Sequence, residues 1–127
     1  MQAEFLLETV EKLKARGIDE IAVETSGYAP KEVFSAVAKV CSQVILDIKI
    51  FDREKHKKYT GVYNDKIKEN FLWLKESGIP YLIRTPLIEG KTDDKENLQA
   101  IADFIGDSPW EKLPENKMAK AKYDMLV

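Results

Sequence analysis

Two oppositely charged residues stand two positions apart in an otherwise apolar part of the sequence. The segment "QVILDIKIF", residues 43–51, has the composition of a buried β-strand and contains Asp47 and Lys49. Because side chains two residues apart on a strand face the same side, the carboxylate and the ammonium point to one place. The residues alone leave two interpretations open. One is a salt bridge or a polar edge strand, and the other is a site for a zwitterionic or ribose-bearing ligand.

Two other polar groups occur in or after predicted strands. In "VETSGYAP", Ser26 and Gly27 are typical turn formers, while Glu24 and Thr25 have oxygen atoms that suit a cation or a polar ligand. In "YLIRTPLIEG", Arg84 lies between apolar neighbours and must meet a carboxylate, either from the protein or from a ligand. For both groups an ordinary structural role stays open beside the functional one.

The elements that must position these residues alternate between helix and strand. The periodicity predicts helices over residues 4–17, 30–40, 64–78 and 93–106, and strands over residues 19–27, 43–51 and 80–88. The spacing of Asp93 and Glu96 is typical of a helix-capping box. This order predicts parallel βα units with right-handed connections, in which functional residues gather at the C-terminal ends of the strands.

The chain is therefore predicted to be one α/β domain over residues 1–127, but it has few strands for a barrel. A closed eight-unit barrel takes about 250 residues, whereas this chain of 127 residues yields three predicted strands. The tail, "DSPWEKLPENKMAKAKYDMLV", is rich in Pro, Lys and Asn and predicts no fourth strand. We expect parallel βα units that form an arc of a larger, TIM-like barrel.

Composition narrows the possible partners and the compartment. The 20 basic and 22 acidic residues give a net charge of −2, which favours neither nucleic acid nor an anionic membrane as a partner. No apolar run reaches the length of a membrane span, and the first residues lack the pattern of a signal peptide. The expected location is cytoplasmic.

The chain has one cysteine, Cys41, and one histidine, His56. These two residues cannot build an internal disulfide, a Cys/His zinc site or a cysteine-ligated iron–sulfur site from this chain alone. Cys41 follows an apolar run and is predicted to be a small buried hydrophobe. His56 lies in "REKHKKYTG", which is predicted to be a solvated, Lys-rich turn.

Five strings in order carry a resemblance to a known family. They are "VETSGYAP", "LDIKIFDREKHKKYTGV", "NDKIKEN", "LIRTPLIEGKTDDKEN" and, more faintly, "KAKYDML". With these strings the chain resembles the glycyl-radical-enzyme activating enzymes, which are radical S-adenosylmethionine proteins typified by the pyruvate formate-lyase-activating enzyme. The main match runs from about Ile18 to Asn97 and covers most of the chain.

The resemblance implies a fold and a set of cofactor-binding residues. The family fold is an incomplete (β/α)6 barrel with its cofactor at the C-terminal ends of the strands. Asp47 and Lys49 match the pair that holds the ribose and the methionine carboxylate of S-adenosylmethionine. Glu24 and Thr25 match a pair that lines a monovalent-cation site with Asp47, and Ser26 is counted with them as cofactor-binding. Arg84 matches an arginine at the face that meets ligand and substrate.

The resemblance also implies the chemistry and partners of a whole enzyme. A 4Fe-4S cluster on a CxxxCxxC motif cleaves S-adenosylmethionine, and the 5′-deoxyadenosyl radical abstracts hydrogen from a glycine of a partner such as pyruvate formate-lyase. Flavodoxin or ferredoxin is the implied electron donor.

This chain departs from that pattern in several ways, and the first barrel strands and the Gly-Gly-Glu segment of the family's second strand are absent from it. It lacks the CxxxCxxC motif, and it reads "KLPENKMAKAKYDML" where the family has a strand ending in "LLPYH", a departure around residues 110–117. We therefore expect a fragment that carries part of the S-adenosylmethionine site and is inactive alone, with no catalytic residue of its own. The alternative is a cluster-less paralogue that acts as a protein-binding or regulatory module.

Overall fold

The computed structural model describes residues 3–18 and 20–114, and for residues 3–6 it describes the backbone only. Each predicted helix and strand is present, although several bounds differ. The elements follow one another as α1 (Ala3–Ala15), β1 (Ala22–Thr25), α2 (Lys31–Val40), β2 (Gln43–Asp47), α3 (Arg53–Thr60), α4 (Asp65–Ser77), β3 (Tyr81–Leu87), α5 (Lys95–Ile105) and β4 (Trp110–Pro114). None of the described helices is long and apolar enough to cross a membrane.

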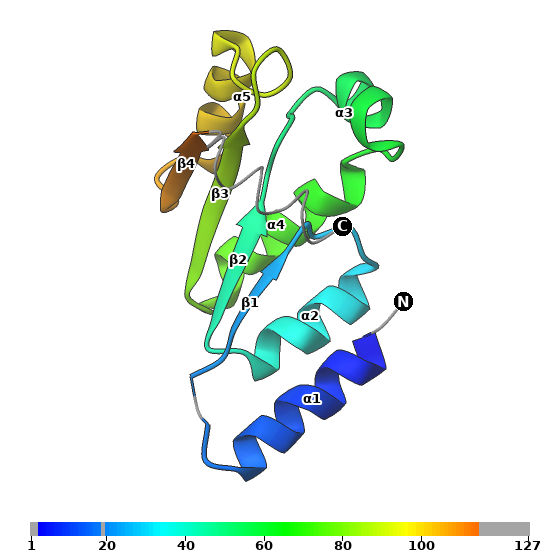
Figure 1. Ribbon diagram of the computed structural model, residues 1–127, viewed down its shortest axis with the longest axis vertical. Helices are drawn as coiled ribbons and strands as arrows, with labels where there is room; N and C mark the ends of the chain where they lie inside the picture. Colours follow the sequence, from blue (N-terminus) through cyan, green and yellow to red (C-terminus); the bar gives the residue numbers. More distant parts are fainter. Residues whose placement is uncertain (1–2, 19, 115–127) are drawn as a thin grey trace, which may run out of the picture.

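The four strands form one parallel sheet in the order β1-β2-β3-β4. Helices connect each strand to the next, so that the chain advances across the sheet by one strand at a time (Figure 1). This arrangement confirms the predicted α/β class with parallel βα units. Because a strand that advances in one direction builds a barrel wall rather than a doubly wound sheet, the fold is an arc of a TIM-like barrel.

Helices cover one face of the sheet, and the core lies between them and the strands. Phe71 and Leu74 of α4 and Ile101 of α5 are fully buried against the strand residues Leu46 and Ile83. Helix α2 adds to the same core, and α1 lies beside α2 (Figure 1). On the opposite face the described chain places no helix, so the alternate residues of each strand stay partly exposed.

The absence of a fourth strand was a wrong prediction. Strand β4 pairs in parallel with β3, and Trp110 donates a hydrogen bond from its Nε1 to Thr85 Oγ1 at 2.9 Å. Its outer residues, among them Leu113 and Pro114, are exposed. Lys and Pro are typical of an edge strand, whose order comes from the neighbouring strand rather than from local periodicity. The string "KAKYDML" and the end of the departure after Pro114 lie outside the described residues.

The Lys-rich segment after β2 is a helix, so the predicted turn was also wrong. Helix α3 is capped by Asp52, whose side chain accepts a hydrogen bond from the Lys55 N–H, and it ends at Gly61 in the left-handed conformation. His56 faces inward and is only 5% exposed. Its Nδ1 lies 2.7 Å from the Val62 carbonyl oxygen, which holds the loop after the helix.

Two smaller predictions also need adjustment. The cap of α5 is Asp94, which accepts a hydrogen bond from the Asn97 N–H, whereas Asp93 accepts one from the Gly90 N–H. The predicted capping box was therefore one residue out of place. Cys41 follows the last turn of α2 and is partly rather than fully buried, and this burial raises the pKa of its thiol.

Candidate functional site

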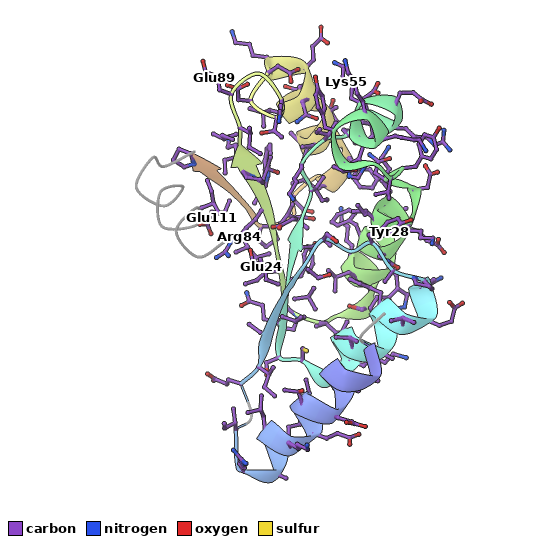
Figure 2. All side chains as sticks on the ribbon, turned by 45° about the vertical axis from the view of Figure 1, so that its right-hand side comes forward. Glu24, Tyr28, Lys55, Arg84, Glu89 and Glu111 are labelled. Atoms are coloured by element: carbon purple, nitrogen blue, oxygen red, sulfur yellow. The ribbon has the colours of Figure 1, made fainter. Side chains whose placement is uncertain are left out.

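Four charged side chains meet near the C-terminal ends of the strands, on the face without helices. Asp47 pairs in register with Arg84, and Arg84 pairs with Glu111 on β4. Glu24 on β1 belongs to the same face (Figure 2). Figure 2 shows Glu24, Arg84 and Glu111 together on the side of the strands away from α2. Three of these four side chains, Glu24, Asp47 and Arg84, are candidates that sequence reasoning placed at the strand ends, and Glu111 is an addition from β4.

Arg84 is held by two protein carboxylates. Its Nη1 lies 3.5 Å from Glu24 Oε1, and its Nε lies 3.7 Å from Glu111 Oε2. Of the two partners that the sequence left open for Arg84, the structure supplies the protein carboxylates. Because the three side chains are partly exposed, solvent weakens these ion pairs, and each contributes at most about 1 kcal/mol.

Asp47 and Lys49 do not form the salt bridge that was one interpretation of their spacing. Strand β2 ends at Asp47, so that Lys49 lies in an extended segment just beyond the sheet. Among the described residues, no hydrogen bond or ion pair engages either side chain. Burial raises the pKa of Asp47, the Glu24 carboxylate raises it further, and Lys49 and Arg84 act in the opposite direction. Asp47 is thus a half-buried carboxylate with charged neighbours and no close protein partner.

A cleft of about 200 Å³ opens at this end of the sheet. Ser26, Tyr28, Asp47, Lys49 and Lys68 are among the residues that line it. The carboxylate, the ammonium and the Ser26 hydroxyl thus contribute an acceptor, a cation and a small polar group to one cavity. This combination suits a ligand that carries vicinal hydroxyls and a carboxylate.

Thr25 is the one candidate whose side chain turns away from this group. It follows Glu24 on β1, so its side chain belongs to the other face of the strand, where it borders a separate cavity beside α2. Its Oγ1 accepts a hydrogen bond from the Gly27 N–H at 3.0 Å and stabilises the turn after β1. Within the part of the chain that the structure describes, no three His, Cys, Asp or Glu side chains gather as a metal site.

Three buried asparagines support the loops of the site, and sequence reasoning gave them no role. Asn70 donates from Nδ2 to the carbonyl oxygens of Gly27 and Ala29, at 2.8 and 2.9 Å. Asn64 and Asn97 bind the backbone that follows β2. Their positions were a readable clue, because Asn70 falls within the apolar stripe of its helix, where an amide is costly unless it has buried partners.

The sequence model of the radical SAM superfamily matches residues 1–105. A crystal structure of a domain of the pyruvate-formate lyase-activating enzyme from Bacteroides vulgatus ATCC 8482 superposes with a TM-score of 0.76 at 33% identity, covering 90% of this chain and 69% of that one.

Sequence relatives of the chain are likewise activating enzymes. The chain is 43% identical over 107 residues to the 4-hydroxyphenylacetate decarboxylase activating enzyme of Clostridium scatologenes, covering 83% of this chain and 34% of that protein. It is 36% identical over 128 residues to the trans-4-hydroxy-L-proline dehydratase activating enzyme of Clostridioides difficile, covering 97% and 42%. The chain thus spans less than half the length of these relatives.

Proposed function

This chain belongs to the radical SAM superfamily, among the activating enzymes of glycyl radical enzymes, and from this premise we propose that its cleft is part of an S-adenosylmethionine site. The family uses S-adenosylmethionine, which supplies the organic radical, together with a 4Fe-4S cluster. The observation that carries the proposal is the pair Asp47 and Lys49, which line one cleft without close protein partners.

Each charged residue has a distinct role in this proposal. Asp47 accepts hydrogen bonds from the ribose hydroxyls, and Lys49 pairs with the methionine carboxylate. Ser26 lies on the same cleft and offers a hydroxyl to the polar part of the ligand. Arg84 stands beside Asp47 in register and adds positive charge at the ligand face. These groups bind and orient the ligand, and none of them donates or accepts a reacting proton.

A monovalent cation is proposed next to Asp47. The Glu24 carboxylate raises the pKa of Asp47, so that a cation between the two would offset their repulsion. Thr25 belongs to the proposed set by its place beside Glu24, although its hydroxyl is engaged with the Gly27 N–H. Both carboxylates are accessible enough to exchange solvent for an ion.

The residues of this chain do not fit the iron–sulfur cluster. One cysteine cannot provide the several thiolates that a 4Fe-4S cluster needs, and Cys41 lies at the opposite end of α2 from the loop after β1. We infer that the chain alone is inactive. In the whole protein it contributes part of the S-adenosylmethionine site of an enzyme that installs a glycyl radical on a partner. Flavodoxin or ferredoxin is the proposed electron donor, and the proposed location is the cytoplasm.

Calorimetry with S-adenosylmethionine tests the proposed site. The chain is expected to bind the ligand, Asp47→Ala to weaken binding by at least about tenfold through loss of a charged acceptor, and Lys49→Ala to act similarly. Asp103→Ala is the matched control, because Asp103 is an exposed carboxylate on α5 outside the cleft and its loss should leave affinity unchanged. A folded chain that binds no ligand would contradict the proposal and favour a protein-binding module.

A further inference from the structure

The backbone that carries Lys49 has left the sheet. The last residue of β2 in the ladder is Asp47, opposite Arg84, and the next amide, of Ile48, donates to the Arg84 carbonyl oxygen at 2.9 Å. On the other side, β1 ends earlier, at Thr25 opposite Leu46. Residues 48–51 therefore run past the sheet, and other groups must satisfy their backbone N–H and C=O groups.

Asn97 is the third residue of α5, and both the Nδ2 and the Oδ1 of its side chain bind this segment. Its Nδ2 donates to the Lys49 carbonyl oxygen at 2.8 Å and to the Thr92 carbonyl oxygen at 2.9 Å, and its Oδ1 accepts from the Phe51 N–H at 2.9 Å. Both amide hydrogens and the oxygen of Asn97 are used. The side chain thus fixes the chain on either side of Ile50 and ties it to the loop before α5.

Asn64, at the N-cap position of α4, completes the support, and its side chain binds this segment rather than the helix. Its Nδ2 donates to the Ile50 carbonyl oxygen at 3.0 Å and to the Phe51 carbonyl oxygen at 2.9 Å, and it is 2% exposed. Thr85 on β3 donates from its Oγ1 to the Ile48 carbonyl oxygen at 2.6 Å. Every carbonyl oxygen from Ile48 to Phe51 therefore accepts a hydrogen bond from a side chain rather than from the backbone of a neighbouring strand.

We propose that Asn97, with Asn64, is a positioning residue that holds the Lys49 backbone so that the ammonium stands beside Asp47 in the cleft. A lysine side chain has four rotatable bonds, and a mobile backbone beneath it would spread its charge over a wide volume. Fixing the carbonyl of Lys49 limits where the ammonium reaches. The proposal extends the proposed function, since it concerns the residue assigned to the ligand carboxylate.

The first test needs no ligand, because the pKa of Asp47 depends on the distance between its carboxylate and the Lys49 ammonium. The charged groups that face Asp47 are Glu24, which raises its pKa, and Lys49 and Arg84, which lower it. Lys49→Met should raise the pKa of Asp47, measured by carbon-13 NMR of the carboxyl group. Asn97→Ala should raise it by part of that amount, and in the Lys49→Met background Asn97→Ala should have no further effect.

Ser108→Ala is the matched control for the loss of a buried polar side chain. Ser108 is also buried and donates to the Ile105 carbonyl oxygen at 2.7 Å, but it lies before β4, at the other end of the sheet. It should leave the pKa of Asp47 unchanged even where it lowers stability. The milder Asn97→Ser, which is too short to span both carbonyls, serves where Asn97→Ala does not fold. An unchanged pKa in Asn97→Ser, or equal shifts with and without Lys49, would overturn the proposal.

The second test separates this inference from the proposed function. Asn97→Ser should weaken S-adenosylmethionine binding roughly tenfold, which corresponds to the loss of one charge-assisted contact. It should leave the affinity for 5′-methylthioadenosine, which lacks the carboxylate, nearly unchanged. If the unsubstituted chain binds no S-adenosylmethionine, the proposed function is contradicted. The NMR measurement of the Asp47 pKa still decides whether Asn97 positions Lys49. Equal losses for both ligands would make Asn97 a general structural residue and contradict the positioning role.

Discussion

The two faces of β2 are formed by alternate residues of one short strand, yet they differ in burial and in polarity. Val44 and Leu46 face the helices and are fully buried. Ile45 and Asp47 face away from them and stay partly exposed. The covered face is determined by apolar burial, whereas the uncovered face keeps charged groups whose partners are few. The same fold thus assigns stability to one set of residues and leaves the other set for the proposed ligand site.

The loop after β1 shows how closely the two faces depend on each other. Gly27 lies beneath the helices, and a Cβ at this position would meet Leu46 Cδ1 at 2.6 Å. The neighbouring residue Ser26 lines the cleft. The backbone that presents the Ser26 side chain to the cleft therefore rests directly on the core, so that core packing sets the position of this cleft residue.

The largest effect is expected from a cavity on the covered face. Leu46→Ala should lower the free energy of unfolding by about 3 kcal/mol, because it removes buried methyl groups from a packed core. Ile45→Ala, one residue away on the uncovered face, should cost roughly 1 kcal/mol, since that side chain keeps contact with solvent. Urea unfolding measures both. Equal losses would show that the uncovered face is as well packed as the core and would break the comparison.

A smaller loss is expected where the loop meets the core. Gly27 has a φ of +72°, and the nearby Leu46 side chain, which a Cβ at Gly27 would meet, is fully buried. Gly27→Ala should therefore cost about 2 kcal/mol, from left-handed strain and from overpacking together. Gly61→Ala is its control, because Gly61 also has a positive φ but open space around it, and should cost about 1 kcal/mol. Similar losses in the two variants, measured by thermal unfolding, would rule out the steric part.

The division between the faces also explains what the sequence could predict. Helices α1, α2, α4 and α5 and the first three strands follow from periodicity, because burial of one face requires an alternating or helical pattern of apolar residues. Strand β4 has no such pattern, since its outer residues are exposed and its pairing with β3 supplies its order. His56 was assigned to a turn because five residues of "REKHKKYTG" are charged, although Asp52 and Gly61 are readable caps of a helix.

The candidate site was predictable in its residue types more than in its geometry. Asp47, Lys49 and Arg84 stood out as charges within apolar segments, and the structure places them near one another. The contribution of Glu111 to Arg84 depended on a strand that the sequence did not reveal. The hydrogen bonds of Asn97 join it to Phe51 and Lys49, which lie 46 and 48 residues earlier in the chain. No local sequence pattern indicates contacts between residues so far apart.

The smallest effect should have the opposite sign. Burial and Glu24 raise the pKa of Asp47 in the folded chain above its ordinary value of 3.8. Between the unfolded and the folded pKa, the folded state binds more protons, so that stability falls as the pH rises through this window. At neutral pH the carboxylate therefore lowers stability. Asp47→Asn should raise the free energy of unfolding at pH 7, by less than about 1 kcal/mol because solvent screens this half-buried group.

The gain should disappear below the window, at a pH under the unfolded value, where Asp47 is protonated in both states. Chemical unfolding at neutral and acidic pH gives the difference, and Asp103→Asn, on the exposed surface of α5, reports the effect of losing an ordinary carboxylate. The same Asp47→Asn variant should lose ligand affinity. If the Asp47→Asn chain is more stable but no longer binds S-adenosylmethionine, Asp47 favours ligand binding at the expense of stability. No substitution on the covered face of β2 should have this combination of effects. An Asp47→Asn chain that is less stable than the unsubstituted chain at pH 7 would instead mean that the Asp47 carboxylate has a stabilising partner in the fold.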